Sequence, residues 1–226
     1  MQEAKTALGG KPVVLASAGA KQLSMAYLWH GRVLRTRKKY EDAIKDFDES
    51  IKADPDNQNA YQMKAKCLLT LHLCEQAVAV CRTALRVDPR HMNCSHYMSM
   101  AYEELKQNQA AADALTHAID LSAKSPTTKR DLEIWMRRRA QLYCRTYQKE
   151  KCLKDWDDLV KLDPNNAMNR IGRGKALVAF SEFKPAEQEF AHGLATDPKH
   201  RATYLVNLGC LEIIRGDLQD ALKNLK

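Results

Sequence analysis

Residues 24–57 read SMAYLWHGRVLRTRKKYEDAIKDFDESIKADPDN, and residues 58–91 read QNAYQMKAKCLLTLHLCEQAVAVCRTALRVDPRH. Both stretches are 34 residues long and end near an Asp-Pro pair, which returns at 163–164 and 197–198. Small residues lie at fixed distances before each of these prolines: Ala43, Ala77, Cys152 and Ala186 twelve before, and Gly31, Ala65, Ala140 and Gly174 twenty-four before. Such a period indicates an array of repeated structural units.

Each unit is expected to hold two antiparallel helices. Small residues at fixed places let two backbones approach closely, while bulky residues such as Phe47, Trp156 and Phe190 fill the remaining space. The Asp-Pro pair fits the end of a helix, because proline cannot continue it and the residue before proline is pushed out of the α region. One hairpin cannot bury its own apolar face, so the units are expected to stack into a solenoid.

The pattern resembles the tetratricopeptide repeat family over residues 24–226. The resemblance implies an all-α fold, a right-handed solenoid of helix-turn-helix units, with first helices beginning near 24, 58, 92, 133, 167 and 202. Three features depart from the family. The seventh position, usually leucine, carries His30, Lys64, Arg139 and Arg173. Leu159 stands where a small residue is usual, and seven extra residues fall within 122–131.

This register divides the chain into four parts. Residues 1–23 are either an N-terminal tail or the end of a preceding repeat, 24–121 hold the first three units, 122–131 form a lengthened turn, and 132–226 hold units four to six. The sixth unit stops partway through its second helix at Lys226. Since such arrays normally end in a polar capping helix, we interpret the chain as part of a longer array.

Composition and motifs argue against an enzyme, a membrane protein and a disulfide scaffold. The chain has 226 residues, a net charge of +8 and seven cysteines. No apolar run reaches transmembrane length, and the odd cysteine count is typical of a reduced, cytoplasmic protein. Cys67, Cys74 and Cys81 fall at positions expected to pack between helices. His91, Cys94 and His96 lack the remaining ligands of a closed zinc site. We therefore expect no catalytic residues, no metal and no cofactor.

The resemblance also places a ligand groove along the first helices of the units. Its lining positions, carried onto this sequence, predict a partner-binding set of Arg32, Arg35, Gln62, Lys66, Asn93, His96, Arg137, Gln141 and Lys175, with Glu103 as the acidic member. Five basic residues against one acidic residue favour an acidic ligand through steering and charge-assisted contacts. The alternative is that these residues have no binding role: the aliphatic parts of the long side chains cover apolar surface and the charged groups stay in water.

Two functions stay open on this reading. The first is a non-enzymatic scaffold or adaptor that presents a basic groove to an acidic or extended protein segment. The second is a structural subunit of a cytoskeletal, ciliary or ribonucleoprotein assembly, held by its basic surface. Nucleic acid is not favoured as a partner, because single-strand binding uses stacking aromatics and the aromatics here occupy core positions. The residues of the chaperone-binding carboxylate clamp do not match in any register.

Overall fold

The computed structural model describes residues 17–122 and 128–216, and all regular structure in these ranges is helical. The chain divides into two compact units, residues 1–126 and 127–226, and the division falls within the predicted lengthened turn. Residues 123–127 of that turn lie outside the described residues.

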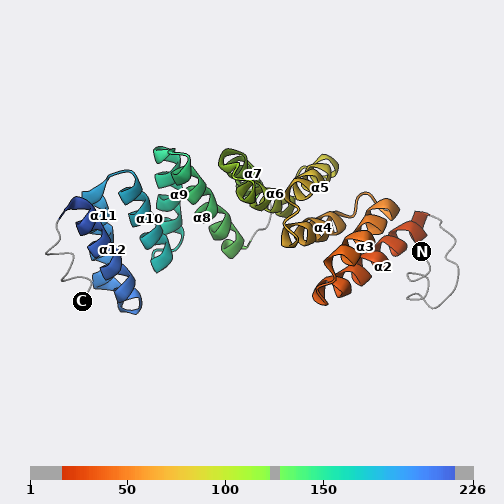
Figure 1. The fold of residues 1–226 in the computed structure, drawn as a ribbon, viewed down its shortest axis with the longest axis horizontal. Helices are drawn as coiled ribbons and strands as arrows, with labels where there is room; N and C mark the ends of the chain where they lie inside the picture. Colours follow the sequence, from red (N-terminus) through yellow and green to blue (C-terminus); the bar gives the residue numbers. More distant parts are fainter. Residues whose placement is uncertain (1–16, 123–127, 217–226) are drawn as a thin grey trace. The chain divides into compact units, whose positions relative to one another are not determined.

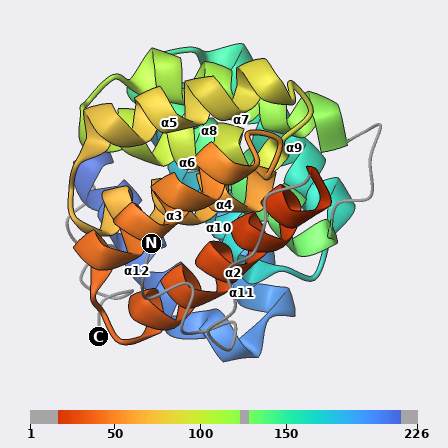
Figure 2. The same cartoon turned by 90° about the vertical axis from the view of Figure 1, so that its right-hand side faces the viewer.

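Within residues 17–122, the first unit holds three helical hairpins, which can be followed in Figure 1. They are formed by α2 (Ser17–Thr36) with α3 (Tyr40–Ala53), α4 (Gln58–Thr70) with α5 (Cys74–Val87), and α6 (Met92–Glu104) with α7 (Asn108–Ser122). Figure 2 shows α2 and α3 side by side in the first hairpin. Each hairpin packs on the next, α3 against α4 and α5 against α6.

Within residues 128–216, the second unit holds two hairpins and a further helix. α8 (Lys129–Arg145) pairs with α9 (Lys149–Leu162), and α10 (Ala167–Ala179) pairs with α11 (Phe183–Thr196). A 3₁₀ turn, Pro198–His200, leads into α12 (Arg201–Arg215), which packs on α11. The expectation of an all-α helical repeat solenoid is therefore confirmed within each unit.

The predicted helix starts hold for four of the six first helices to within one residue: α4, α6, α10 and α12. α8 begins at Lys129, four residues early, because the Thr128 hydroxyl caps it by accepting a hydrogen bond from the Asp131 N–H at 3.1 Å. α2 begins at Ser17, seven residues before the expected start. The predicted N-terminal boundary at residue 24 therefore falls inside a helix.

Small residues and aromatic rings meet where the repeat register places them. A Cβ atom on Gly31 would lie 2.7 Å from Cε1 of Phe47, and one on Gly174 would lie 2.3 Å from Cε1 of Phe190. Phe47 and Phe190 are almost fully buried, each in its own hydrophobic cluster. Glycine at these two positions is thus what allows a first helix to rest directly on the ring of its partner helix.

The Asp-Pro pairs end the second helices as expected. The backbone of Asp54 and Asp88 is extended, and each N–H still bonds back to the last helical turn. The side chain of Asp88 then accepts a hydrogen bond from the Arg90 N–H at 3.0 Å. The carboxylate therefore stabilises the turn that leads into the next unit.

One backbone feature recurs in every hairpin without any signal in the sequence. The turn between the two helices places one residue in the left-handed region: Lys38, His72, Lys106, Tyr147 and Ser181, with φ between 56° and 61°. None of them is glycine, although this conformation costs other residues about 1 to 2 kcal/mol. Geometry of the hairpin overrides local preference at this position.

Lys38→Gly is expected to raise the free energy of unfolding by about 1 kcal/mol, because glycine adopts this conformation without strain. The exposed Lys45 lies inside α3 and serves as the matched control. Lys45→Gly should lower stability by about 1 kcal/mol. Urea unfolding followed by circular dichroism measures both, and a loss of stability in both variants would contradict the turn geometry.

Candidate functional site

The predicted groove residues of the first unit lie on α2, α4 and α6, and α4 contacts both of the other helices. The Asn93 side-chain amide donates to Oε1 of Gln62 at 3.4 Å, which joins the residues of α6 to those of α4. The guanidinium of Arg32 stacks 4.4 Å from the ring centre of the exposed Trp29. Lys66 is exposed, while Arg35 and His96 are half-buried. This set offers cations on a surface that also carries an aromatic ring.

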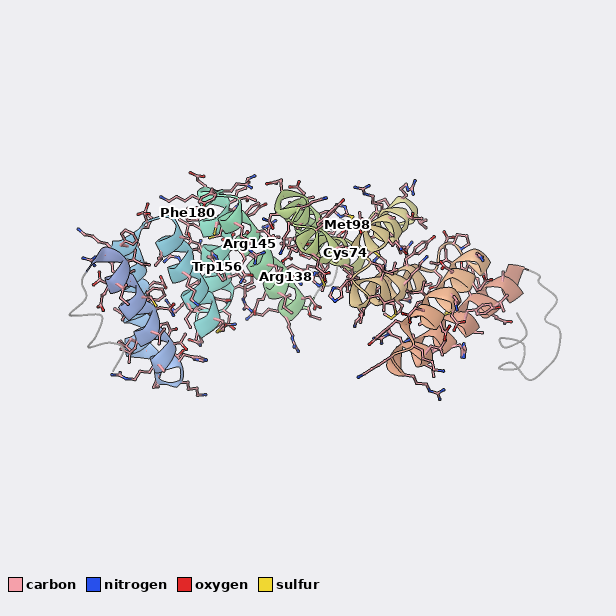
Figure 3. The ribbon with its side chains drawn as sticks, viewed as in Figure 1. Cys74, Met98, Arg138, Arg145, Trp156 and Phe180 are labelled. Atoms are coloured by element: carbon pink, nitrogen blue, oxygen red, sulfur yellow. The ribbon has the colours of Figure 1, made fainter. Side chains whose placement is uncertain are left out.

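In the second unit the structure brings together Gln141 and Lys175, two of the three predicted residues. They line a hollow of about 240 Å³, which we call the Trp156 hollow. α8 contributes Gln141, Cys144 and Arg145 to it, α9 contributes Trp156, and α10 contributes Gly172, Lys175 and Ala176. Figure 3 shows Arg145 and Trp156 in this part of the second unit. The lining is cationic and apolar, because none of its seven residues is acidic.

Gly172 explains how an indole ring comes to line this hollow. Trp156 is 3% exposed, and a Cβ atom on Gly172 would lie 2.1 Å from its Cη2 atom. The ring therefore occupies space that any other residue at 172 would take. The sequence indicated Trp156 only as a core residue, and it gave no signal for Gly172 or Arg145.

The third predicted residue, Arg137, is not part of the Trp156 hollow. Its guanidinium donates to Oδ1 of Asn169 at 2.9 Å. Asn169 is fully buried and in turn donates to the carbonyl of Leu159 at 3.0 Å. Arg137 thus links α8 through Asn169 to the end of α9, so its replacement would change packing as well as surface charge.

The basic residues at the seventh position of the units are used within the fold. His30 pairs with Asp46 at 2.6 Å, and Lys64 pairs with Asp48. Arg139 makes two bonds to Asp155, from Nε at 2.8 Å and from the terminal nitrogen at 2.7 Å. Arg173 bonds Asp157 and Glu189. These pairs hold first helices against second helices. Because the basic side chains are already paired, their charges do not contribute to ligand binding.

The buried pair of Arg139 and Asp155 is the most enclosed of these. Asp155 is 3% exposed. Its burial raises the pKa of the carboxyl above its ordinary value, while the hydrogen bond from Arg139 acts in the opposite direction. The hydrogen bonds from Arg139 therefore offset the cost of burying the charged carboxylate.

The cysteines and histidines singled out in the sequence do not form a metal centre within the two described ranges, where no group of three or more potential ligands occurs. Cys67, Cys81 and Cys94 are fully buried. Burial raises the pKa of the Cys67 thiol to about 11. Nδ1 of His91 accepts from the Cys94 N–H at 3.2 Å and so caps α6. No helix in the described ranges has both the length and the apolar character to span a membrane.

Comparison with known proteins agrees with this architecture. Residues 34–97 match the family model for the tetratricopeptide repeat. The chain is 26% identical over 185 residues to a DnaJ homolog subfamily C member 7 homolog from Schizosaccharomyces pombe, an alignment that covers 74% of this chain and 38% of that protein. The chain therefore spans well under half of that relative's length.

Solved structures share the fold at low sequence identity. MamA superimposes with a TM-score of 0.68 at 19% identity, over 79% of this chain and 93% of that one. YrrB, described as a tetratricopeptide repeat protein with an unusual peptide-binding site, gives a TM-score of 0.61 at 19% identity over 79% of this chain and 88% of that one.

Proposed function

We propose that this chain, whose residues 34–97 match the tetratricopeptide repeat model, is an interaction scaffold whose first helices bind an extended acidic segment of a partner protein. Proteins of this fold are generally non-enzymatic scaffolds. The observation that carries the proposal is the Trp156 hollow, where Lys175 and Arg145 border an indole ring with no acidic residue in the lining.

The chemistry of the hollow matches a segment in which acidic and apolar side chains alternate at every second position, so that both kinds lie on one face. An extended chain places successive side chains on opposite sides, so every second residue faces the protein. A leucine-sized side chain would enter the hollow beside the half-buried Cys144 and Gly172, and the carboxylate of the residue two positions along would reach Lys175. Each exposed ion pair contributes only about 0 to 1 kcal/mol, so the affinity depends on several such contacts along the first helices.

The first unit supplies a second set of contacts of the same kind. Lys66 and Arg32 are exposed there, and the exposed Trp29 lies under the Arg32 guanidinium. Cations next to aromatic surface suit the same alternation of acidic and apolar side chains. The proposal therefore assigns one class of ligand to both units.

Reversing the charge of the hollow is expected to weaken binding of an acidic peptide. The probe is a fluorescein-labelled decapeptide in which glutamate and leucine alternate at every second position with serine between them. The variant is Gln141→Glu with Lys175→Glu. We expect its affinity to fall by about tenfold, since loss of one pair and gain of repulsion together amount to roughly 1.4 kcal/mol. Fluorescence anisotropy at low and moderate salt measures it.

Lys154→Glu is the matched control, because Lys154 is an exposed lysine on α9 that does not line the hollow. It changes the net charge without touching the proposed site. A peptide with glutamine in place of glutamate tests the charge of the ligand. Equal loss of affinity in the control and in the double variant, or equal binding of both peptides, would refute the proposal.

A further inference from the structure

A second hollow in the second unit is polar and lies apart from the Trp156 hollow. It measures about 490 Å³ and lies where the turn before α10 meets the turn before α12. Its lining includes Arg170 from α10, His192 from α11, Asp197 and Lys199 from the turn, and Tyr204 from α12. None of these residues belongs to the groove set. Figure 1 shows α10, α11 and α12 as neighbours in this part of the chain.

Tyr204 lines this hollow and carries an unsatisfied hydroxyl group. Tyr204 is fully buried, and its hydroxyl oxygen has no hydrogen-bond partner. The ring is held against α11, since a Cβ atom on Gly193 would lie 2.2 Å from Cε1 of Tyr204. Leaving such a buried polar group unpaired destabilises the folded state. A ligand in the hollow that hydrogen-bonds to the Tyr204 hydroxyl would therefore stabilise the folded state.

The hydroxyl is available as a hydrogen-bond donor. Burial raises the pKa of Tyr204 above its ordinary value, and the neighbouring Asp197 acts in the same direction. The phenol consequently stays protonated at neutral pH. A group that accepts a hydrogen bond is the natural complement.

The charges around the hollow favour an anion. The guanidinium of Arg170 is held by Oε1 of Glu189 at 3.1 Å and by the Pro164 carbonyl at 3.3 Å. Asp197 is paired with Nδ1 of His200 at 2.8 Å. Lys199 and His192 are exposed, and within the described part of the chain neither side chain has an ionic or hydrogen-bond partner. The rim therefore has an uncompensated ammonium group.

We propose that this hollow binds a small oxyanion, a carboxylate or a phosphate group, which accepts a hydrogen bond from the Tyr204 hydroxyl while Lys199 balances its charge. A volume of about 490 Å³ admits such a group together with the small molecule that carries it. The site does not depend on the proposed acidic-segment groove, because the two share no residue.

The test compares thermal unfolding of the full chain in inorganic phosphate, in acetate and in chloride at one ionic strength. A bound anion stabilises the folded state by RT ln(1 + L/Kd), where L is the free anion concentration, so phosphate or acetate should raise the melting temperature above the chloride value. Tyr204→Phe removes only the hydroxyl and should lose this rise. Without anion, this variant should melt no lower than the original chain.

Tyr61→Phe is the control, because Tyr61 is the fourth residue of α4 just as Tyr204 is the fourth residue of α12. It should keep the full rise. Lys199→Gln alters an exposed residue and should reduce the rise by at least half, which keeps the test decisive even if Tyr204→Phe folds poorly. A rise with phosphate alone identifies a phosphate site, and a rise with acetate alone identifies a carboxylate site.

Two outcomes overturn the proposal. The first is an equal anion-dependent rise in the original chain, in Tyr204→Phe and in Lys199→Gln, which places the anion elsewhere or reflects a general salt effect. The second is that neither anion raises the melting temperature of the original chain, which would show that the hollow does not bind an oxyanion.

Discussion

Asp155→Ala is expected to lower the free energy of unfolding of the second unit by about 3 to 5 kcal/mol, the largest loss among the substitutions considered. Asp155 is 3% exposed and accepts two hydrogen bonds from Arg139, whose side chain is 13% exposed. Removing the carboxylate leaves a guanidinium buried without its counter-ion, and breaking a buried pair from one side carries a cost of this size. Tryptophan fluorescence in urea follows the unit, because Trp135 and Trp156 both lie in it.

The double variant Arg139→Leu with Asp155→Ala separates the pair's charge from its packing. Replacing both partners by apolar groups is often close to neutral, and leucine is the usual residue at this position of the repeat. We expect the double variant to recover most of the stability that Asp155→Ala loses. If it is as unstable as the single variant, the buried charge is not the cause of the loss.

Gly174→Val is expected to lower stability by roughly 1 to 3 kcal/mol or more, the range for overpacking a filled core. The added Cβ would lie 2.3 Å from Cε1 and 2.7 Å from Cζ of Phe190. Phe190 is 1% exposed and belongs to a cluster with Ile171, Tyr204 and Leu211, so its ring has little room to move. Urea unfolding followed by circular dichroism and fluorescence measures the change.

Ala179→Val on the same helix is the control, because Ala179 is exposed at the end of α10. Its cost is limited to the small helix-propensity difference between alanine and valine, under about 0.7 kcal/mol. Similar losses in the two variants would show that α10 does not rest on the Phe190 ring in the predicted register.

The register of the helices could be predicted from the sequence because small and bulky residues recur at fixed positions in each repeat. Gly31 and Gly174 face Phe47 and Phe190, and the Asp-Pro pairs end α3, α5, α9 and α11. The start of α2 was not accessible, because residues 17–23 carry no repeat signal that separates helix from tail. The left-handed turn residues were also hidden, since lysine, histidine, tyrosine and serine at these positions give no local cue.

The candidate site was only partly accessible for a different reason. Position in the repeat identified Gln141 and Lys175, which do line a common hollow. It did not identify Arg145, nor the ring of Trp156 that reaches the hollow through the space left by Gly172. The same reasoning placed Arg137 with them, but its bond to the buried Asn169 depends on a contact between two first helices that sequence spacing does not specify.

The seventh-position residues show how a departure from a family pattern is compensated elsewhere. Where leucine is usual, His30, Arg139 and Arg173 each meet an acidic residue sixteen positions later: Asp46, Asp155 and Glu189. Lys64 and Arg173 also meet an acid sixteen positions earlier, Asp48 and Asp157. In the third unit the position is Met98, which lines an outer hollow of about 400 Å³ instead. The charged positions therefore belong to the architecture and not to the ligand surface.

The most direct test of the central proposal is the composition of peptides that the chain selects from a random displayed library. We expect the selected peptides to be enriched in aspartate and glutamate spaced with apolar residues. We expect this enrichment to disappear when the chain carries Lys66→Glu and Lys175→Glu. Selected peptides with no acidic bias, or the same acidic bias from the charge-reversed chain, would contradict it.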